Sequence, residues 1–241
     1  MLQCSHSFFA GETMNHRRAA LNAAFPHTIP VFAGYCFLGM SYGILMKTSG
    51  FPFWYPMLTS MVVFAGSMEF MLVNLLLGAF DLVHAFALTL MINARHLFYG
   101  LSMLEPYKGL DRKGYLIFGL TDETFSVNCA TDAPEGIDKG QFYFFITLLN
   151  QSYWVLGATL GGIFGLFLHF NTEGLDFVMT ALFVVILLEH LLTTKDRRSA
   201  FSGMALSLAS LILFGPDQFM LPAMVMILAL LIFAARKEEV K

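Results

Sequence analysis

The chain has 241 residues, of which 57% are hydrophobic and only 13% charged, and its mean hydropathy is +0.67. This composition excludes an ordinary soluble domain and is typical of an integral membrane protein. The formal net charge of −3 and the lack of a large basic cluster argue against nucleic acid as a partner. The three cysteines, Cys4, Cys36 and Cys129, are too scattered to indicate a disulfide framework or a zinc site.

The chain divides into hydrophobic segments bounded by charges, Gly and Pro. We expect residues 1–23 to form a short cytoplasmic tail, residues 24–235 a single transmembrane transporter domain, and residues 236–241 a second cytoplasmic tail. Eight candidate segments are 24–46, 54–79, 82–104, 114–130, 142–170, 175–192, 200–214 and 219–235. Several approach the 17 to 25 residues that a membrane-spanning helix needs, so the predicted fold is an all-α, polytopic helical bundle.

The distribution of basic residues favours cytoplasmic termini but leaves the number of spans open. If all eight segments cross, nine basic residues lie inside and four outside. The exception is the loop "EPYKGLDRKG", whose three basic residues then lie outside. If the segment 114–130 entered and returned without crossing, and one earlier segment did likewise, this loop would move inside. The sequence therefore predicts six to eight spans.

Glycine patterns indicate close helix packing and a possible duplication. "GMSYG" and "GGIFG" are GxxxG patterns, which let transmembrane helices approach closely. The stretch that begins at Gly34 resembles the stretch that begins at Gly157 in the order of its glycines and aromatic residues. This similarity reflects either two related halves or a chance coincidence.

Charged residues lie near the middle of three consecutive segments. Glu69 lies in the second segment, Arg95 and His96 in the third, and Asp122 and Glu123 in the fourth. An ionised residue at a helix centre costs about 2.5–3.5 kcal/mol on insertion scales, and an apolar residue returns about 0.3–0.6 kcal/mol. The segment 114–130 should therefore not insert alone. Uncharged polar residues in the same three segments are Asn74, Asn93, Thr121, Thr124, Ser126 and Asn128.

Arg95 is the cation nearest in depth to the paired acids, so we expect it to pair with Asp122 or Glu123. Such a pair could line a polar cavity, or it could only orient the helices. Glu69 has no cation in its own segment: it is protonated, shares Arg95, or titrates during transport. His96 either packs and hydrogen-bonds or carries a proton.

These residues carry a resemblance to a known family. "FAGSMEF", "NARHLFYG" and "GLTDETFSV", in that order and after the glycine-rich "GYCFLGMSYGIL", resemble the AzlC family of branched-chain amino-acid permeases. The resemblance covers residues 26–230. It implies export of Leu, Ile, Val or their analogues across the bacterial inner membrane, and a small hydrophobic AzlD-type subunit as partner. Glu69 departs from the pattern, because Gln is expected there, and the added acid changes the charge of the cavity.

Together with the resemblance, the sequence predicts a multi-pass transporter that is driven by the proton motive force or acts by facilitated release, with the lipid bilayer and an amino-acid substrate as partners. The small membrane subunit is implied by the resemblance alone. The substrate or proton pathway is expected to contain Glu69, Asn93, Arg95, His96, Asp122, Glu123 and Asn128. Arg95 would receive the carboxylate, an acid the ammonium, and Phe64, Phe98 and Phe125 the apolar side chain. The alternatives are a membrane scaffold or an intramembrane enzyme with a structural ion pair. No HExxH, GxSxG or phosphate-loop motif supports an enzyme, so no catalytic, cofactor or metal site is predicted.

Overall fold

The computed structural model describes residues 5–79, 81–167, 184, 188, 198–216, 219, 222–223, 225–227 and 229–230. Within these residues every regular element is an α-helix, as predicted. The chain divides into two compact units, Met1–Val178 and Met179–Lys241. The second unit contains α9 (Arg198–Phe214), where Ser210 Oγ donates a 2.7 Å hydrogen bond to the Phe219 carbonyl. The predicted segments 175–192 and 219–235 lie largely outside the described residues.

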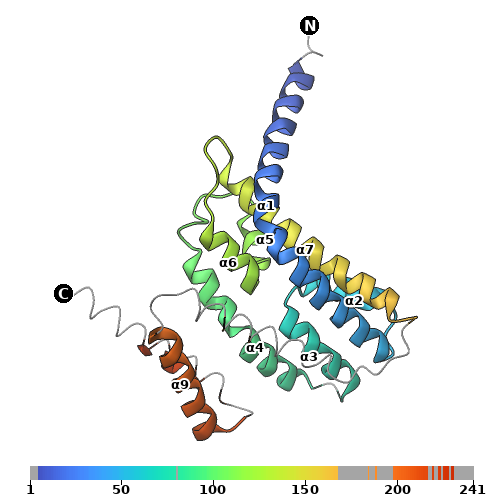
Figure 1. Cartoon of the computed structure of the whole chain (residues 1–241), viewed down its shortest axis with the longest axis vertical. Coiled ribbons are helices and arrows are strands. Elements are labelled where there is room, and N and C mark those ends of the chain that lie inside the picture. The colour runs from blue at the N-terminus through green and yellow to red at the C-terminus, as the bar shows by residue number, and fades with distance from the viewer. Residues whose placement is uncertain are drawn as a thin grey trace, which may run out of the picture. The chain divides into compact units, whose positions relative to one another are not determined.

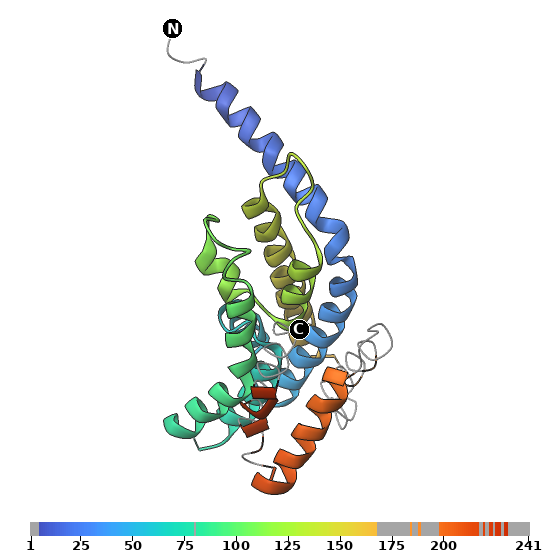
Figure 2. The same ribbon diagram turned by 90° about the vertical axis from the view of Figure 1, so that its left-hand side faces the viewer.

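Two long helices, α1 (Ser5–Thr48) and α7 (Lys139–Phe164), form the backbone of the first unit (Figure 1). Their contacts advance together along both helices: Thr28 Oγ1 lies 3.0 Å from Tyr153 Oη, and farther along, Lys47 lies against Gly165. The two helices are therefore parallel, although they are far apart in sequence (Figure 2). Helix α1 begins inside the segment 1–23 that was expected as a tail.

Glycine makes this pairing possible, as the GxxxG patterns predicted. A Cβ atom on Gly39 would lie 2.9 Å from Ala158 N and from Trp154 O, both backbone atoms of α7. A Cβ atom on Gly157 would lie 2.9 Å from the Cys36 carbonyl oxygen of α1. Real Cβ atoms do not come this close to backbone, so these positions admit glycine alone without a shift of a helix.

The second predicted segment is a helical hairpin rather than one helix. Helix α2 (Trp54–Val62) ends at a turn in which Phe64 has a φ of 44°, and α3 (Gly66–Leu77) then runs back. On α1, Tyr42 hydrogen-bonds Thr59 of α2 at 2.8 Å and also contacts the ring of Phe70 in α3. Both arms therefore lie beside the same turn of α1. We call residues 54–77 hairpin A.

The fourth predicted segment is a second hairpin. Helix α5 (Lys113–Phe118) ends at Gly119, and α6 (Asp122–Ala130) begins after the N-cap Thr121, whose hydroxyl accepts from the Thr124 amide. A Cβ atom on Gly119 would overlap the Thr147 side chain of α7, so the turn needs glycine. The far ends of both arms return to one place on α7, because Arg112 lies over Phe144 and Tyr143 Oη donates to the Thr131 carbonyl. We call residues 113–130 hairpin B.

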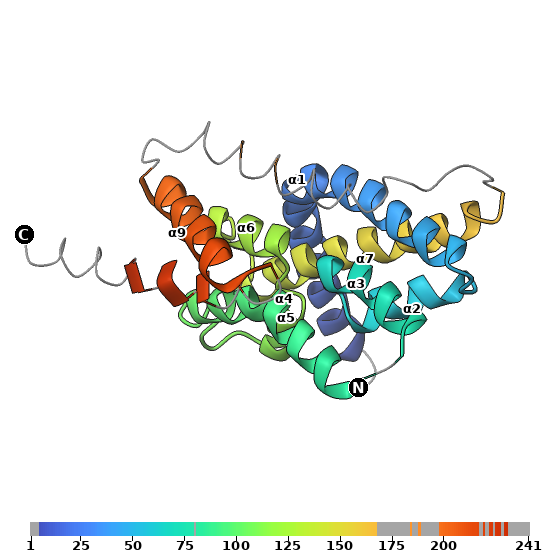
Figure 3. The same ribbon diagram turned by 90° about the horizontal axis from the view of Figure 1, so that it is seen from below.

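The two hairpins approach from opposite ends of the α1–α7 pair. Hairpin A packs on the C-terminal half of α7, where Pro56 lies near Gly162, and hairpin B packs on the N-terminal half (Figures 1 and 3). Helix α4 (Leu82–Ser102) connects them and starts at Asp81, whose side chain accepts from the Val83 amide. An apolar cluster that includes Tyr107, Leu116 and Phe142 fills the space beside hairpin B.

The expected span count is not confirmed. Within the part of the chain that the structure describes, one helix, His16–Thr48 inside α1, is both long and apolar enough to cross a membrane by itself. The breaks at Phe64 and Gly119 divide two of the predicted spans into arms of 6 to 12 residues, too short to cross singly.

A first prediction concerns the glycine contact between α1 and α7. Gly39→Ala should lower the free energy of unfolding by about 1–3 kcal/mol, because the new methyl group meets α7 backbone that cannot move independently. Gly34→Ala is a matched control on the same helix, since a Cβ atom there meets nothing within 4 Å. Thermal unfolding of the purified proteins in detergent measures both. Equal melting temperatures for the two variants would contradict the tight helix crossing.

Candidate functional site

The turns of the two hairpins meet at the middle of the α1–α7 pair. The rings of Phe64, in the hairpin A turn, and Phe118, before the hairpin B turn, have centroids 6.4 Å apart. Tyr35 of α1 contacts both turns: its ring lies edge-on to Phe64, and its hydroxyl lies 2.6 Å from Thr121 Oγ1. We call this meeting point the hairpin junction.

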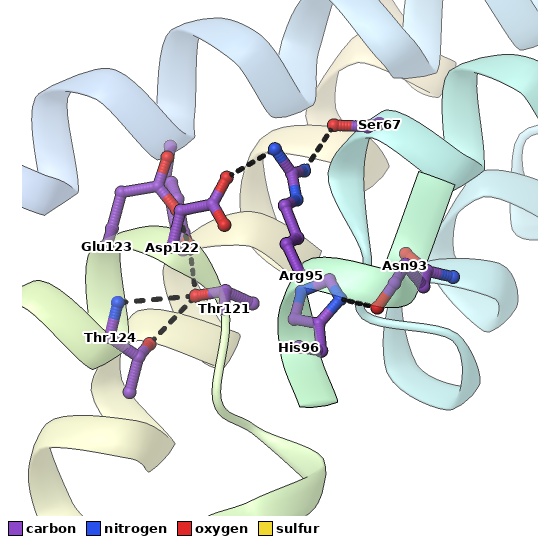
Figure 4. A network of polar contacts seen from close by, with 9 residues as sticks. Ser67, Asn93, Arg95, His96, Thr121, Asp122, Glu123 and Thr124 are labelled. Carbon is purple, nitrogen blue, oxygen red and sulfur yellow. Dashed lines mark hydrogen bonds and ion pairs between the residues drawn. The ribbon is translucent and has the colours of Figure 1, made fainter. Parts of the chain in front are cut away.

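Arg95 of α4 bridges the two hairpins at the junction. One terminal nitrogen lies 3.0 Å from Asp122 Oδ2 in hairpin B, and the other donates a 2.8 Å hydrogen bond to Ser67 Oγ in hairpin A (Figure 4). The predicted ion pair is therefore present, with Asp122 as its acidic partner. One guanidinium joins the first turns of two separate half-helices, so movement of either hairpin must break a contact to Arg95.

The paired acids occupy the first turn of α6, where local physics favours them. A helix N-terminus carries a partial positive charge, and acidic residues there are stabilised by about 0.3–1 kcal/mol. Asp122 points toward Arg95 (Figure 4). Glu123 has another partner, because Tyr35 donates a 2.8 Å hydrogen bond to Glu123 Oε2. Adjacent carboxylates thus have different partners, and each is stabilised by a different helix.

A chain of polar side chains leads from Glu123 to α7. From Tyr35 it continues through Thr121 to Thr124, whose hydroxyl oxygens are 3.0 Å apart. Asn150 Nδ2 then donates to Thr124 Oγ1 at 3.1 Å. Thr124 and Asn150 are fully buried. Hairpin B therefore contacts α7 through a polar seam, although the surrounding protein is apolar.

Glu69 lies in a separate, fully enclosed position in hairpin A. Its side chain has no exposed surface. Ser60 Oγ donates to Oε2 at 2.8 Å, Trp154 Nε1 to Oε1 at 2.9 Å, and the Ala65 amide to Oε1 at 3.2 Å. These three neutral donors hold the carboxylate between both arms of hairpin A and α7. Sequence analysis allowed Glu69 to share Arg95 with the other acids. The three contacts of the Glu69 carboxylate are instead to Ser60, Trp154 and the Ala65 amide.

The comparisons with known proteins agree with the motifs at this site. Residues 30–168 match the family described as AzlC protein, and these residues include both hairpins and the whole junction. The chain belongs to the AzlC family. No solved structure matches it.

Relatives in the AzlC family cover most of the chain. It is 58% identical over 214 residues to a protein of Bacillus subtilis (strain 168) named branched-chain amino acid transport protein AzlC, covering 88% of this chain and 84% of the relative. It is 42% identical over 225 residues to a membrane protein of Haemophilus influenzae, covering 92% of each. A membrane protein of Helicobacter pylori (strain J99) is 37% identical over 221 residues, covering 91% and 97%.

The remaining predicted residues of this AzlC protein are not all at the junction. His96 Nδ1 lies 3.3 Å from the Asn93 carbonyl oxygen on the same helix (Figure 4). The His96 ring lies edge-on to Tyr99. Asn128 lies at the other end of α6, where its amide donates to the Tyr107 hydroxyl at 2.7 Å. Asn74 and Ser126 are exposed and do not belong to the site.

Sequence analysis missed three residues that hold the acids in place, Tyr35, Ser60 and Trp154, and one that accepts a hydrogen bond from Arg95, Ser67. Tyr35 and Trp154 were not considered as site residues because the search covered charged and uncharged polar residues, although each of these aromatic side chains carries one hydrogen-bond donor. The ring centroids of Tyr35 and Trp154 are 5.4 Å apart. Because Tyr35 bonds Glu123 and Trp154 bonds Glu69, this aromatic pair lies between the two glutamates. A tyrosine or tryptophan on a helix that is predicted to pack closely could have been identified by its hydroxyl or indole N–H, which needs a hydrogen-bond partner when it is buried.

A second prediction tests the enclosure of Glu69. Trp154→Phe should lower the free energy of unfolding by about 1–3 kcal/mol, since it removes a donor to a buried carboxylate and keeps the aromatic ring. Trp54→Phe is the matched control, because Trp54 is exposed on α2 and is the only other tryptophan in the chain. Chemical unfolding in detergent reports both changes. Unchanged stability of the Trp154 variant would show that the bond to Glu69 contributes nothing.

Proposed function

We propose that this AzlC protein transports branched-chain amino acids or their analogues, and that the substrate passes through the hairpin junction. The observation that carries the proposal is the junction itself, where Arg95 and two carboxylates lie between the turns of opposed hairpins. The Bacillus subtilis relative, named as a branched-chain amino acid transport protein, supports the substrate class. Half-helices that end near mid-membrane are a common way to build transporter sites.

The charges of the junction suit a zwitterion. The Arg95 guanidinium binds the substrate carboxylate, and a carboxylate of the first α6 turn binds the ammonium group. Phe64 lies in the hairpin A turn, and Phe125 stacks on Tyr99 with centroids 4.5 Å apart. These rings supply an apolar wall for an aliphatic side chain. Asn93, His96 and Asn128 lie along the same helices and are assigned to the pathway on either side of the junction.

We assign the direction of transport as export across the bacterial inner membrane, with a small AzlD-type subunit as partner and the proton motive force as the energy source. The resemblance of the motifs to two-component exporters supports the partner and the direction. Glu69, which is buried, and Glu123, which is partly buried and bonds Tyr35, are the acids that could carry a coupling proton. The test is efflux of labelled leucine from cells with and without the co-expressed small subunit.

The hairpins also suggest a membrane topology. If neither hairpin crosses, α1, α4 and α7 are the spans of the first unit, and α4 and α7, with 21 and 26 residues, are about 31 and 39 Å long. Basic residues at the end where α7 begins are Arg17, Arg18, Lys108, Arg112, Lys113 and Lys139, while Lys47 lies at the opposite end. This strong bias supports an N-terminus inside. With three C-terminal segments the chain has six spans.

A third prediction concerns Arg95. Arg95→Gln should reduce leucine efflux by at least about 100-fold, since the loss of a buried charge partner costs several kcal/mol of substrate binding. Lys108→Gln, in an exposed loop, is the control and should transport normally. Efflux is compared at matched protein levels in the membrane. Normal efflux by the Arg95 variant would mean that the ion pair is structural and that the substrate passes elsewhere.

A fourth prediction tests the topology in a background without the native cysteines. Asp81→Cys, before α4, should react with a membrane-impermeant thiol reagent added to intact cells, whereas Glu135→Cys, before α7, should react only after the cells are opened. Both residues are exposed. If both cysteines react from the same side, α4 and hairpin B together cross an even number of times, and the six-span arrangement is wrong.

A further inference from the structure

We propose that Asp122 is an internal competitor of the substrate: its carboxylate occupies Arg95 when the site is empty, and the substrate carboxylate displaces it. This proposal rests on the proposed function and assigns separate roles to the two adjacent acids. Asp122 closes the junction, and Glu123 receives the ammonium group. Displacement of Asp122 releases the turn of hairpin B, so substrate binding opens the contact between the two hairpins.

The geometry of the ion pair supports replacement. Arginine binds a free carboxylate best through two parallel hydrogen bonds. Here one Arg95 nitrogen contacts Asp122 Oδ2 and the other contacts Ser67, so the two-bond arrangement is not formed. Asp122 Oδ1 is buried and accepts no hydrogen bond from the described residues. A free amino-acid carboxylate is not tethered to α6 and can take both nitrogens at once.

Accessibility distinguishes this pair from the other acids. The side chains of Arg95 and Asp122 are 28% and 21% exposed, whereas Glu69 is fully buried and bound by three donors. The Arg95–Asp122 pair is therefore partly exposed, whereas a ligand could reach Glu69 only by unpacking hairpin A. Glu123 bonds Tyr35 of α1 and not Arg95, so it is the acid of the first α6 turn that does not compete for the guanidinium.

The neighbourhood of hairpin B fits an element that moves. Its turn is joined to the rest of the junction by Arg95 and Tyr35, and its α6 arm meets α7 through Thr124 and Asn150. Leu116 and Leu120 pack in the apolar cluster beside it, so the polar contacts of α6 are the part of this surface that opens most easily. Asn150 Oδ1 is buried and has no hydrogen-bond partner among the described residues. Water can replace polar contacts such as these with little loss, whereas opening an apolar seam exposes hydrocarbon. Hairpin A lacks this property because Glu69 ties both its arms to α7.

The experiment measures binding and opening on the full purified chain, with its small subunit if the two copurify. The ligands are L-leucine and L-leucinamide, which has the ammonium group but no carboxylate. Asp122→Asn removes the competing charge and keeps the side-chain shape. Asp132→Asn, in the exposed loop after α6, is the matched control. We expect leucine to bind the Asp122 variant about fivefold more tightly, as for loss of a partly exposed ion pair, and leucinamide binding to stay unchanged.

Opening is followed by thiol labelling at Leu120→Cys, in a background without Cys4, Cys36 and Cys129. Leu120 lies in the hairpin B turn and is 3% exposed, so labelling reports release of the turn. Leucine should accelerate labelling when Asp122 is intact, and leucinamide should not. Asp122→Asn should accelerate labelling without any ligand. The comparison of labelling with leucine, with leucinamide and without ligand uses the protein with Asp122 intact. It therefore remains decisive if the Asp122 variant does not fold.

Two results would overturn the proposal. Weaker or unchanged leucine binding by Asp122→Asn would mean that Asp122 binds the ammonium group or only orients helices. Labelling that neither leucine nor Asp122→Asn accelerates would mean that Asp122 does not hold hairpin B. Failure of the proposed function gives a different pattern. The native protein would then bind no leucine, and Arg95→Gln would leave leucine efflux unchanged. Thiol labelling of the Asp122 variant without ligand would still test whether Asp122 holds the hairpin B turn.

Discussion

The arrangement of the described part of the chain depends on one guanidinium held between two hairpin turns. Neither hairpin could occupy an apolar bundle by itself, because each brings carboxylates and the open ends of broken helices to the same depth. Arg95 compensates Asp122 directly and bonds Ser67 of the other hairpin. The charged groups of α4 and α6 thereby compensate each other, and the contacts of Arg95 fix the positions of α3, α4 and α6 relative to one another.

This arrangement requires a rigid frame, which the parallel α1–α7 pair supplies. Because Gly39 and Gly157 allow backbone-to-backbone approach, the two helices behave as one thick support along which both hairpins lie. The same pair also supplies the side chains that satisfy the acids: Tyr35 of α1 bonds Glu123, and Trp154 of α7 bonds Glu69. Packing and polar satisfaction are therefore carried by the same two helices, on adjacent turns.

The sequence predicted the helical class, the close glycine packing and the Arg95 ion pair, because each has a strong local signal. Insertion energies alone showed that the segment 114–130 could not be an ordinary span, and the hairpin B turn explains why. Hairpin A was not predicted. Residues 54–79 are nearly all apolar, and the reversal at Phe64 has no proline and only a following glycine to mark it. Hydropathy measures whether a segment favours lipid, and it cannot measure whether the chain turns back.

Glu69 and Asp122 show why similar depth did not mean a shared partner. Glu69, Arg95 and Asp122 were expected in one cavity, yet Glu69 is enclosed by neutral donors and Asp122 holds the cation. A family that places Gln at position 69 would need the same oxygen acceptor for Trp154, and an amide provides it without a charge. In the proposed mechanism, the acid at this position alters the charge beside the pathway while it preserves the bond that fixes hairpin A. On the same proposal, hairpin A stays fixed when its charge changes, whereas hairpin B, whose turn is held by an ion pair, responds to a charge that enters the junction.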